Sequence, residues 1–158
     1  MQMSEHGLEL LKQWEGFKNK LYYDSAGLPT IGVGHLLTKS ELSSGKIIIN
    51  GVPVKYDGGL SDQQVLDLLS QDVNPAAQVV TNKVTVGLNQ NQFDALTSFT
   101  FNVGGAAFTG STLLKLLNQG QYDEVPGQLR RWNKAGGKVV QGLINRRENE
   151  IKLWNGTI

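Results

Sequence analysis

The pattern of polar, apolar and turn-forming residues changes at Leu60, and this change limits the folds that the chain can adopt. Before it, short strand-like runs are separated by Gly, Pro and Asn, which favour turns. After it, capping residues precede apolar residues at helical spacing, as in residues 61–64 and 89–92. A small β region followed by a mostly helical region indicates an α+β protein.

The local patterns predict individual elements. We expect a helix over residues 4–14 that Gly16 ends, with Ser4 as its N-cap and Glu15 at its C-terminal edge. Pro75 is expected to break or restart the helix that follows Leu60. The other expected elements are strands at 20–23 and 30–35, a hairpin at 47–54, helices at 89–103, 111–120, 123–132 and 143–154, and a small hairpin or loop at 136–142.

Length and composition exclude several classes of protein. The 158 residues suit one domain with a sizeable core. The absence of cysteine and the presence of only two histidines exclude a disulfide framework, a thiol nucleophile and a conventional Cys- or His-rich metal site. No apolar run reaches the roughly 18 residues of a spanning helix, and the N-terminus lacks the pattern of a secretory signal. We therefore expect no metal, no cofactor and no membrane-embedded segment.

Charge is unevenly distributed along the chain. Residues 1–128 hold 8 Lys/Arg and 12 Asp/Glu, whereas residues 129–158 hold 7 and 2. The basic end is compatible with an anionic partner such as nucleic acid, a membrane surface or an acidic wall polymer. A solvated helix face rich in arginine explains the same charges, so composition leaves both interpretations open.

Two carboxylates near the N-terminus are candidates for acid–base chemistry. Glu15 lies at the predicted helix end, and Asp24 lies where the first strand meets its turn. A helix end and a hairpin can bring two such groups to opposite walls of one cleft. Glycoside hydrolysis needs one protonated and one ionised carboxyl group in this arrangement. On spacing alone, solvated or capping roles are the commoner explanation for such residues.

The spacing of the motif residues adds information to this pair. Asp24 follows Glu15 by nine residues, and Thr30 follows Asp24 by six and opens the run TIGVGH. This order resembles the phage-type lysozymes of glycoside hydrolase family 24. Further matching segments are NQNQFDAL (89–96), FNVG (101–104), FTGSTLL (108–114) and GLINRRE (142–148).

The resemblance implies roles for individual residues. Glu15 would be the general acid, Asp24 would position and deprotonate the attacking water, and Thr30 would hold that water. His35 would form a structural ion pair with Asp72 rather than act in catalysis. Arg146 would lie beside Glu15, with Arg147 as the alternative. The implied substrate-facing residues are Leu36, Phe101, Asn102, Ser111 and Gln128. For Phe101, packing in the protein core is an equal alternative.

The resemblance also implies an architecture. The fold would be lysozyme-like, an α+β single domain over residues 1–158 with an active-site cleft between two lobes. A small β-containing lobe would cover about residues 1–60, a connecting helix about 61–80, and a larger helical lobe about 81–158.

The implied activity is that of an endolysin, a muramidase that hydrolyses the β-1,4 bond between N-acetylmuramic acid and N-acetylglucosamine in peptidoglycan, with inversion. Such an enzyme would be a monomer without a nucleic-acid partner, made in the host cytoplasm and reaching the wall through a holin-type membrane lesion. One alternative is a lytic transglycosylase, which needs no water-handling Asp. Another is a non-catalytic module that binds cell wall or nucleic acid through the basic end.

Overall fold

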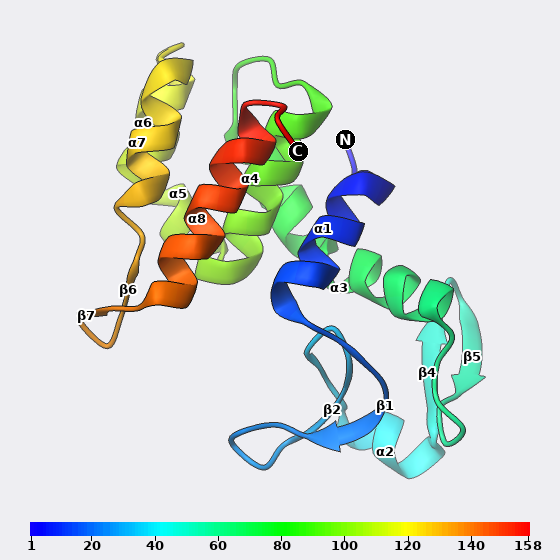
Figure 1. Ribbon diagram of the computed structural model, residues 1–158. Helices are drawn as coiled ribbons and strands as arrows, with labels where there is room; N and C mark the ends of the chain where they lie inside the picture. Colours follow the sequence, from blue (N-terminus) through cyan, green and yellow to red (C-terminus); the bar gives the residue numbers. More distant parts are fainter. The chain divides into compact units, whose positions relative to one another are not determined.

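The computed structural model describes residues 1–158 and combines helices with three small sheets (Figure 1). This confirms the α+β class. The chain divides into two compact units: Leu8–Asp72, termed here the β-containing unit, and Met1–Gly7 with Val73–Ile158, termed the helical unit. Helices α1 (Glu5–Glu15) and α3 (Asp62–Lys83) contribute residues to both units.

The β-containing unit holds two antiparallel sheets. The first sheet has three strands, β1 (Lys18–Tyr23), β2 (Pro29–Gly32) and β3 (His35–Leu36), with β2 in the centre. Helix α2 (Lys39–Ser44) follows it. The second sheet consists of β4 (Lys46–Ile49) and β5 (Val52–Lys55). The predicted Asn-Gly hairpin is confirmed. Asn50 and Gly51 join β4 to β5 with φ angles of 54° and 77°, as a two-residue type I′ turn requires.

The first sheet differs from the prediction. Residues 30–35 were expected to form one strand, but the chain turns between Gly32 and Gly34, whose φ angles are 65° and 64°. The result is a third strand, β3. Helix α2 was not predicted, although Thr38 and Glu41 form a complete capping box. None of the residues of α2 is buried, so it has no apolar face for a pattern to reveal.

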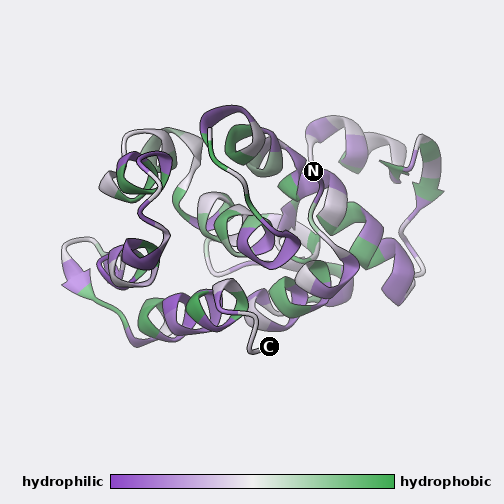
Figure 2. Ribbon diagram, turned by 90° about the horizontal axis from the view of Figure 1, so that it is seen from above, coloured by the Kyte–Doolittle hydropathy of each residue, from purple (hydrophilic) through white to green (hydrophobic).

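The helical unit contains most of the helices. They are α4 (Gln90–Val103), α5 (Gly105–Thr109), α6 (Thr112–Asn118), the 3₁₀ turn η1 (Tyr122–Glu124), α7 (Val125–Arg130) and α8 (Gln141–Trp154), with strands β6 (Lys134–Ala135) and β7 (Lys138–Val139) before the last. The small hairpin or loop expected at 136–142 is a hairpin, but it begins at Lys134, and residues 141–142 already belong to α8. Helices α4 and α8 pack together around a buried core, and Figure 2 shows hydrophilic and hydrophobic residues alternating along the helices.

Pro75 does not interrupt its helix. The prediction of a break there is wrong, because α3 runs through Pro75 for 22 residues. A proline inside a helix removes one backbone hydrogen bond and costs about 3 kcal/mol. Pro75 is itself exposed, whereas Val73, Ala76 and Ala77 beside it are buried. The burial of this apolar face offsets the lost bond, so tertiary packing overrides the local preference.

The start of α1 is anchored inside the helical unit. Ser4 caps the helix as predicted, because its hydroxyl accepts a hydrogen bond from the Gly7 amide at 3.0 Å. The Asp94 carboxylate accepts from both the Ser4 amide, at 3.0 Å, and the Ser4 hydroxyl. Gln90 donates to the same carboxylate at 2.8 Å. Asp94 is completely buried, so these bonds replace the water it has lost.

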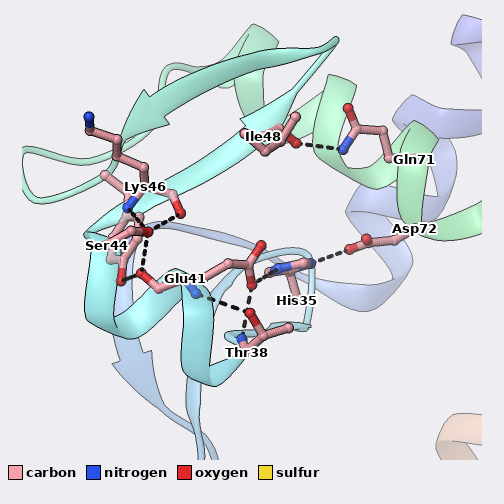
Figure 3. Close-up of polar contacts among 9 residues, drawn as sticks. His35, Thr38, Glu41, Ser44, Lys46, Ile48, Gln71 and Asp72 are labelled. Atoms are coloured by element: carbon pink, nitrogen blue, oxygen red, sulfur yellow. Dashed lines mark hydrogen bonds and ion pairs between the residues drawn. The ribbon is translucent and has the colours of Figure 1, made fainter.

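The ring of His35 is held between two carboxylates in the β-containing unit (Figure 3). Its Nδ1 lies 2.8 Å from Asp72 on α3, so the expected ion pair is present. Its Nε2 lies 2.9 Å from Glu41 on α2, a partner that sequence reasoning missed. Pairing first with Asp72 and then with Glu41 outweighs burial and raises the pKa of His35 from 6.5 to about 9. His35 therefore ties β3 to both neighbouring helices as an imidazolium ion.

Side chains reduce the number of free backbone hydrogen-bonding groups at both edges of the second sheet. Gln71 on α3 donates to the Ile48 carbonyl at 3.0 Å and accepts from the Asn50 amide at 2.7 Å (Figure 3). On the other strand Pro53 pairs with Ile48 and has no amide hydrogen. The two-stranded sheet is thus joined to α3 along β4.

Replacing Gly7 with alanine should destabilise the protein. A Cβ at this position would lie 2.7 Å from Asp94 Oδ2, and this buried carboxylate could move away only by disturbing its hydrogen bonds with Ser4 and Gln90. We expect Gly7→Ala to lower the free energy of unfolding by about 1–3 kcal/mol, measured by urea denaturation. Gly142→Ala in α8 is the matched control, because nothing lies within 4 Å of its Cβ. It should stabilise the protein by about 0.5–1 kcal/mol. Equal effects of the two changes would contradict the anchor.

His35→Gln should make the protein less stable in a pH-dependent way. Because the folded-state pKa is raised from 6.5 to about 9, the contribution of His35 is complete below pH 6.5 and is lost as the pH rises through about 9. We expect a deficit of about 1–3 kcal/mol near pH 6, since the side chain is largely shielded from solvent. The deficit should shrink above about pH 9. Urea denaturation between about pH 6 and pH 10 measures this deficit, with His6→Gln at an exposed position as the control. A deficit that does not change with pH would exclude the ion pairs as its cause.

Candidate active site

Glu15 is the last residue of α1, at the position that the sequence predicted. The helix ends there because Gly16 adopts a left-handed conformation with φ 76°, while its amide still donates to the Lys12 carbonyl at 2.9 Å. The Glu15 side chain is exposed. Strand β1 begins only three residues later, so the chain leads directly from Glu15 into the sheet that carries the other candidate residues.

Asp24 closes the turn between β1 and β2. Its Oδ1 accepts hydrogen bonds from the Ala26 amide at 2.9 Å and from the Leu28 amide at 2.8 Å. Its backbone amide donates to the Leu28 carbonyl, and Gly27 donates to the Asp24 carbonyl, both at 2.9 Å. Both side-chain bonds use Oδ1. The turn therefore fixes the orientation of the carboxylate and leaves Oδ2 to accept from another group.

Thr30 lies on the central strand β2, between Tyr22 of β1 and Leu36 of β3. Its side chain is buried, and its hydroxyl donates to the Leu28 carbonyl at 2.9 Å. With that hydrogen used, the hydroxyl oxygen is an acceptor for any further partner. Asp24 and Thr30 are thus held by the same residue, Leu28, through its amide and its carbonyl respectively.

The predicted substrate-facing residues fall in both units. Leu36 lies beside Thr30 in the β-containing unit and its side chain is 52% exposed. In the helical unit, Phe101 is half-buried and Asn102 is exposed at the end of α4. Gln128 of α7 lines a cavity of about 320 Å³ whose other lining residues are Thr112, Arg131 and Trp132.

Ser111 is the N-cap of helix α6. Its hydroxyl accepts from the Leu114 amide at 3.1 Å and donates to the Phe108 carbonyl at 2.6 Å. Its side chain is also buried. These are the bonds of a helix N-cap, so Ser111 supports the start of α6.

Arg146 and Arg147 are buried in the helical unit around a third charged residue, Glu150. Arg146 Nε lies 3.3 Å from Glu150 Oε2, and Arg147 donates to Oε1. Ser98 of α4 donates to Oε2 at 2.6 Å. Complete burial raises the pKa of Glu150, while the two guanidinium groups and the Ser98 hydroxyl act against this. Arg147 and Arg146 precede Glu150 by three and four residues. On a helix this spacing places side chains side by side, so the sequence held a signal for this cluster.

Two further properties bear on the kind of site. No group of three or more His, Cys, Asp or Glu side chains is placed to hold a metal ion. No helix has both the length and the apolar character needed to cross a bilayer.

Comparisons with known proteins show the family to which the chain belongs. The family model described as phage lysozyme matches residues 12–150. The endolysin of Salmonella phage P22 is 39% identical over 154 residues, covering 98% of both chains. The endolysin of Bacillus phage PZA is 39% identical over 160 residues. The match covers 98% of this chain but only 55% of that longer relative. The crystal structure of a P22 lysozyme mutant has a TM-score of 0.81 and 37% identity, and covers 98% of this chain and 99% of that one.

The match to the family model includes Glu15, Asp24 and Thr30 as well as α4 and most of α8. It is supported by sequence identity over nearly the whole chain and by similarity in structure. The protein therefore belongs to the phage lysozyme family and is a glycoside hydrolase of the lysozyme type.

Proposed function

We propose that the protein is an inverting muramidase that cleaves the β-1,4 bond between N-acetylmuramic acid and N-acetylglucosamine in peptidoglycan. The observation that best supports this proposal is the joint fixing of Asp24 and Thr30 by Leu28. It leaves two hydrogen-bond acceptors, a carboxylate oxygen and a hydroxyl oxygen, on one short hairpin that follows Glu15. A water molecule has two hydrogens to donate to such a pair.

The proposed reaction uses each of these groups once. Glu15 donates its proton to the glycosidic oxygen as the bond to the anomeric carbon breaks. A water donates one hydrogen to Thr30 Oγ1 and the other to Asp24 Oδ2, so a lone pair of its oxygen is directed at the anomeric carbon. Asp24 takes the proton as the water attacks from the face opposite the leaving group. The product has inverted configuration, and proton exchange with solvent returns both carboxyl groups to their starting states.

Other predicted residues would bind the substrate or hold the catalytic groups in place. Leu36 and Phe101 present apolar surface to sugar rings, and Asn102 and Gln128 present amides to their polar substituents. Arg146 would orient Glu15, and the ion pair of His35 with Asp72 would keep β3, and with it Leu36, fixed to α3.

The biological role proposed is lysis of a bacterial host at the end of phage growth. The enzyme would act as a monomer on the cell wall, with no nucleic-acid partner. It would accumulate in the host cytoplasm and reach the wall when a holin-type lesion opens the membrane. These steps rest on the family resemblance.

A lytic transglycosylase is the nearest alternative activity. Such an enzyme needs an acid but no water, because the substrate's own hydroxyl closes an anhydro ring. The two acceptors on the β1–β2 hairpin favour hydrolysis instead. Mass spectrometry of digested peptidoglycan separates the two: hydrolysis gives reducing muramic acid ends, whereas anhydro ends would overturn the proposal. Proton NMR during digestion should show the α-anomer of the new reducing end first, as inversion requires.

Glu15→Gln and Asp24→Asn should abolish most wall hydrolysis without unfolding the protein. Glutamine has no proton to donate, and asparagine cannot accept one, so each change should lower kcat by about 10²–10⁴-fold. The side-chain oxygen that remains after Asp24→Asn still accepts from the two turn amides, so the hairpin should persist. Turbidity loss of isolated walls measures activity, and thermal melting measures folding. Glu9→Gln on α1 and Asp57→Asn are controls and should retain activity; full activity in Glu15→Gln would exclude its role as the acid.

The basic end contributes less surface charge than the sequence suggests. Arg146 and Arg147 are buried around Glu150, and Arg130 makes a two-point contact with Glu148 at 2.7 and 3.3 Å. The exposed cations between α7 and α8 are Arg131, Lys134 and Lys138. They would attract the carboxylates of wall peptides.

Wall hydrolysis should therefore weaken with added salt, because exposed charges are screened beyond about 10 Å at 0.1 M. Neutralising Arg131, Lys134 and Lys138 to glutamine should reduce this salt dependence. Neutralising Lys39, Lys46 and Lys55 of the β-containing unit changes the net charge equally and serves as control. Rates of wall clearance across a salt series measure both. An unchanged slope in the first variant would restore the interpretation of these residues as a solvated face.

A further inference from the structure

One exposed side chain of the helical unit ends a chain of buried polar contacts. Asn102 is the penultimate residue of α4, and its Oδ1 accepts a hydrogen bond from Arg147 of α8. Asn102 is exposed, whereas Arg147 is only 1% exposed. A surface amide is ordinarily free to rotate, but this one is bound to a buried guanidinium group.

The contact determines which way the amide points. A guanidinium group has only donors, so the atom of Asn102 that faces Arg147 is the carbonyl oxygen. The amide nitrogen is then directed away from Arg147. This assignment follows from the chemistry of the two groups and does not depend on distinguishing nitrogen from oxygen by position. Asn102 thus presents hydrogen-bond donors at the surface and keeps its acceptor inward.

Arg147 is itself held on several sides. Its Nε donates to the Trp132 carbonyl at 2.9 Å, and another nitrogen donates to Glu150. Its guanidinium carbon lies 4.9 Å from the centre of the Phe99 ring, which packs edge-to-face on Trp132. These contacts come from three separate segments of the helical unit. Arg147 is therefore a fixed support and not a mobile side chain.

Glu150 completes the support. It is fully buried and accepts from Ser98 at 2.6 Å and from Arg146. Buried charged groups cost more in desolvation than an apolar core of equal volume, so such clusters are often not the most stable solution. By fixing the orientation of the exposed Asn102, the cluster would have a function other than stabilising the fold.

We propose that Arg147 is a positioning residue that orients Asn102 to donate a hydrogen bond to an amide carbonyl oxygen of the wall polymer. This inference rests on the proposed function and specifies the group that the polymer presents. Two sources supply that chemistry: the acetamido groups of the sugars and the peptide groups of the stems. A substituent that only donates would not be bound, because Asn102 offers it no acceptor.

Asn102→Asp tests the donor. Aspartate has nearly the same shape and still accepts from Arg147, but its outward atom is an acceptor. We expect kcat/KM on intact wall to fall about tenfold, through KM rather than kcat. Asn102→Gln keeps the donors on a longer side chain and should recover part of the loss. Thermal melting of both variants should stay near that of the wild type, since the residue is exposed.

The source of the carbonyl is identified by repeating the comparison on two altered walls. If the difference between wild type and Asn102→Asp disappears on de-N-acetylated wall, the partner is an acetamido group. If it disappears on glycan strands stripped of peptide, the partner is a peptide group. Either result supports the donor role of Asn102. Equal kinetics of the two proteins on intact wall would overturn it, whereas an inactive wild type would instead refute the proposed function.

Arg147→Lys tests the positioning role. Lysine keeps the charge beside Glu150 but lacks the fork that reaches Asn102, Trp132 and Glu150 together. We expect KM to rise as in Asn102→Asp, and the double variant to show no further rise. A purely structural role would lower the folded fraction and the apparent kcat but leave KM unchanged. That outcome, or additive effects of the two changes on KM, would overturn the positioning role.

Discussion

The peptide groups around Leu28 are the constraint on which the candidate active site depends. The Leu28 amide holds the Asp24 carboxylate, and the Leu28 carbonyl takes the hydroxyl hydrogen of Thr30. One residue of a short turn thus binds both groups proposed to handle water, and the Ala26 amide binds Asp24 as well. The two backbone amides give Asp24 the fixed orientation that its proposed role as a catalytic base requires.

The two units fix the side chains proposed to be functional by different physical means. In the β-containing unit, backbone hydrogen bonds of a hairpin orient Asp24, and an imidazolium between two carboxylates secures the neighbouring strand. In the helical unit, buried ions around Glu150 orient the exposed Asn102. The first device is short in sequence and tolerates exposure to solvent. The second brings together α4, α8 and the segment after α7, and it works only where water is excluded.

The parts of the fold that were predictable are those where several local signals agree. Helix α4 has a capping box and an apolar face, and the β4–β5 hairpin has an Asn-Gly turn. Helix α2 escaped prediction because it buries nothing, and α3 continued through Pro75 because packing outweighs one lost bond. A motif indicated Glu15, Asp24 and Thr30 as candidate site residues. It did not indicate the contacts of Leu28, because backbone amides and carbonyls are the same whatever the residue type. Glu41 was missed because its contact with His35 depends on the turn between β3 and α2.

The edges of the β4–β5 sheet have a consequence for how the protein behaves when crowded with copies of itself. A two-stranded sheet exposes two edges, each of which can recruit a strand from another molecule. Here the Gln71 side chain occupies the Ile48 carbonyl of β4 and the Asn50 amide of the turn, and Pro53 removes a donor from β5. Neither strand presents an unbroken row of hydrogen-bonding groups. Strand-to-strand polymerisation, an early step toward insoluble aggregates, is therefore disfavoured at this exposed and rather apolar hairpin.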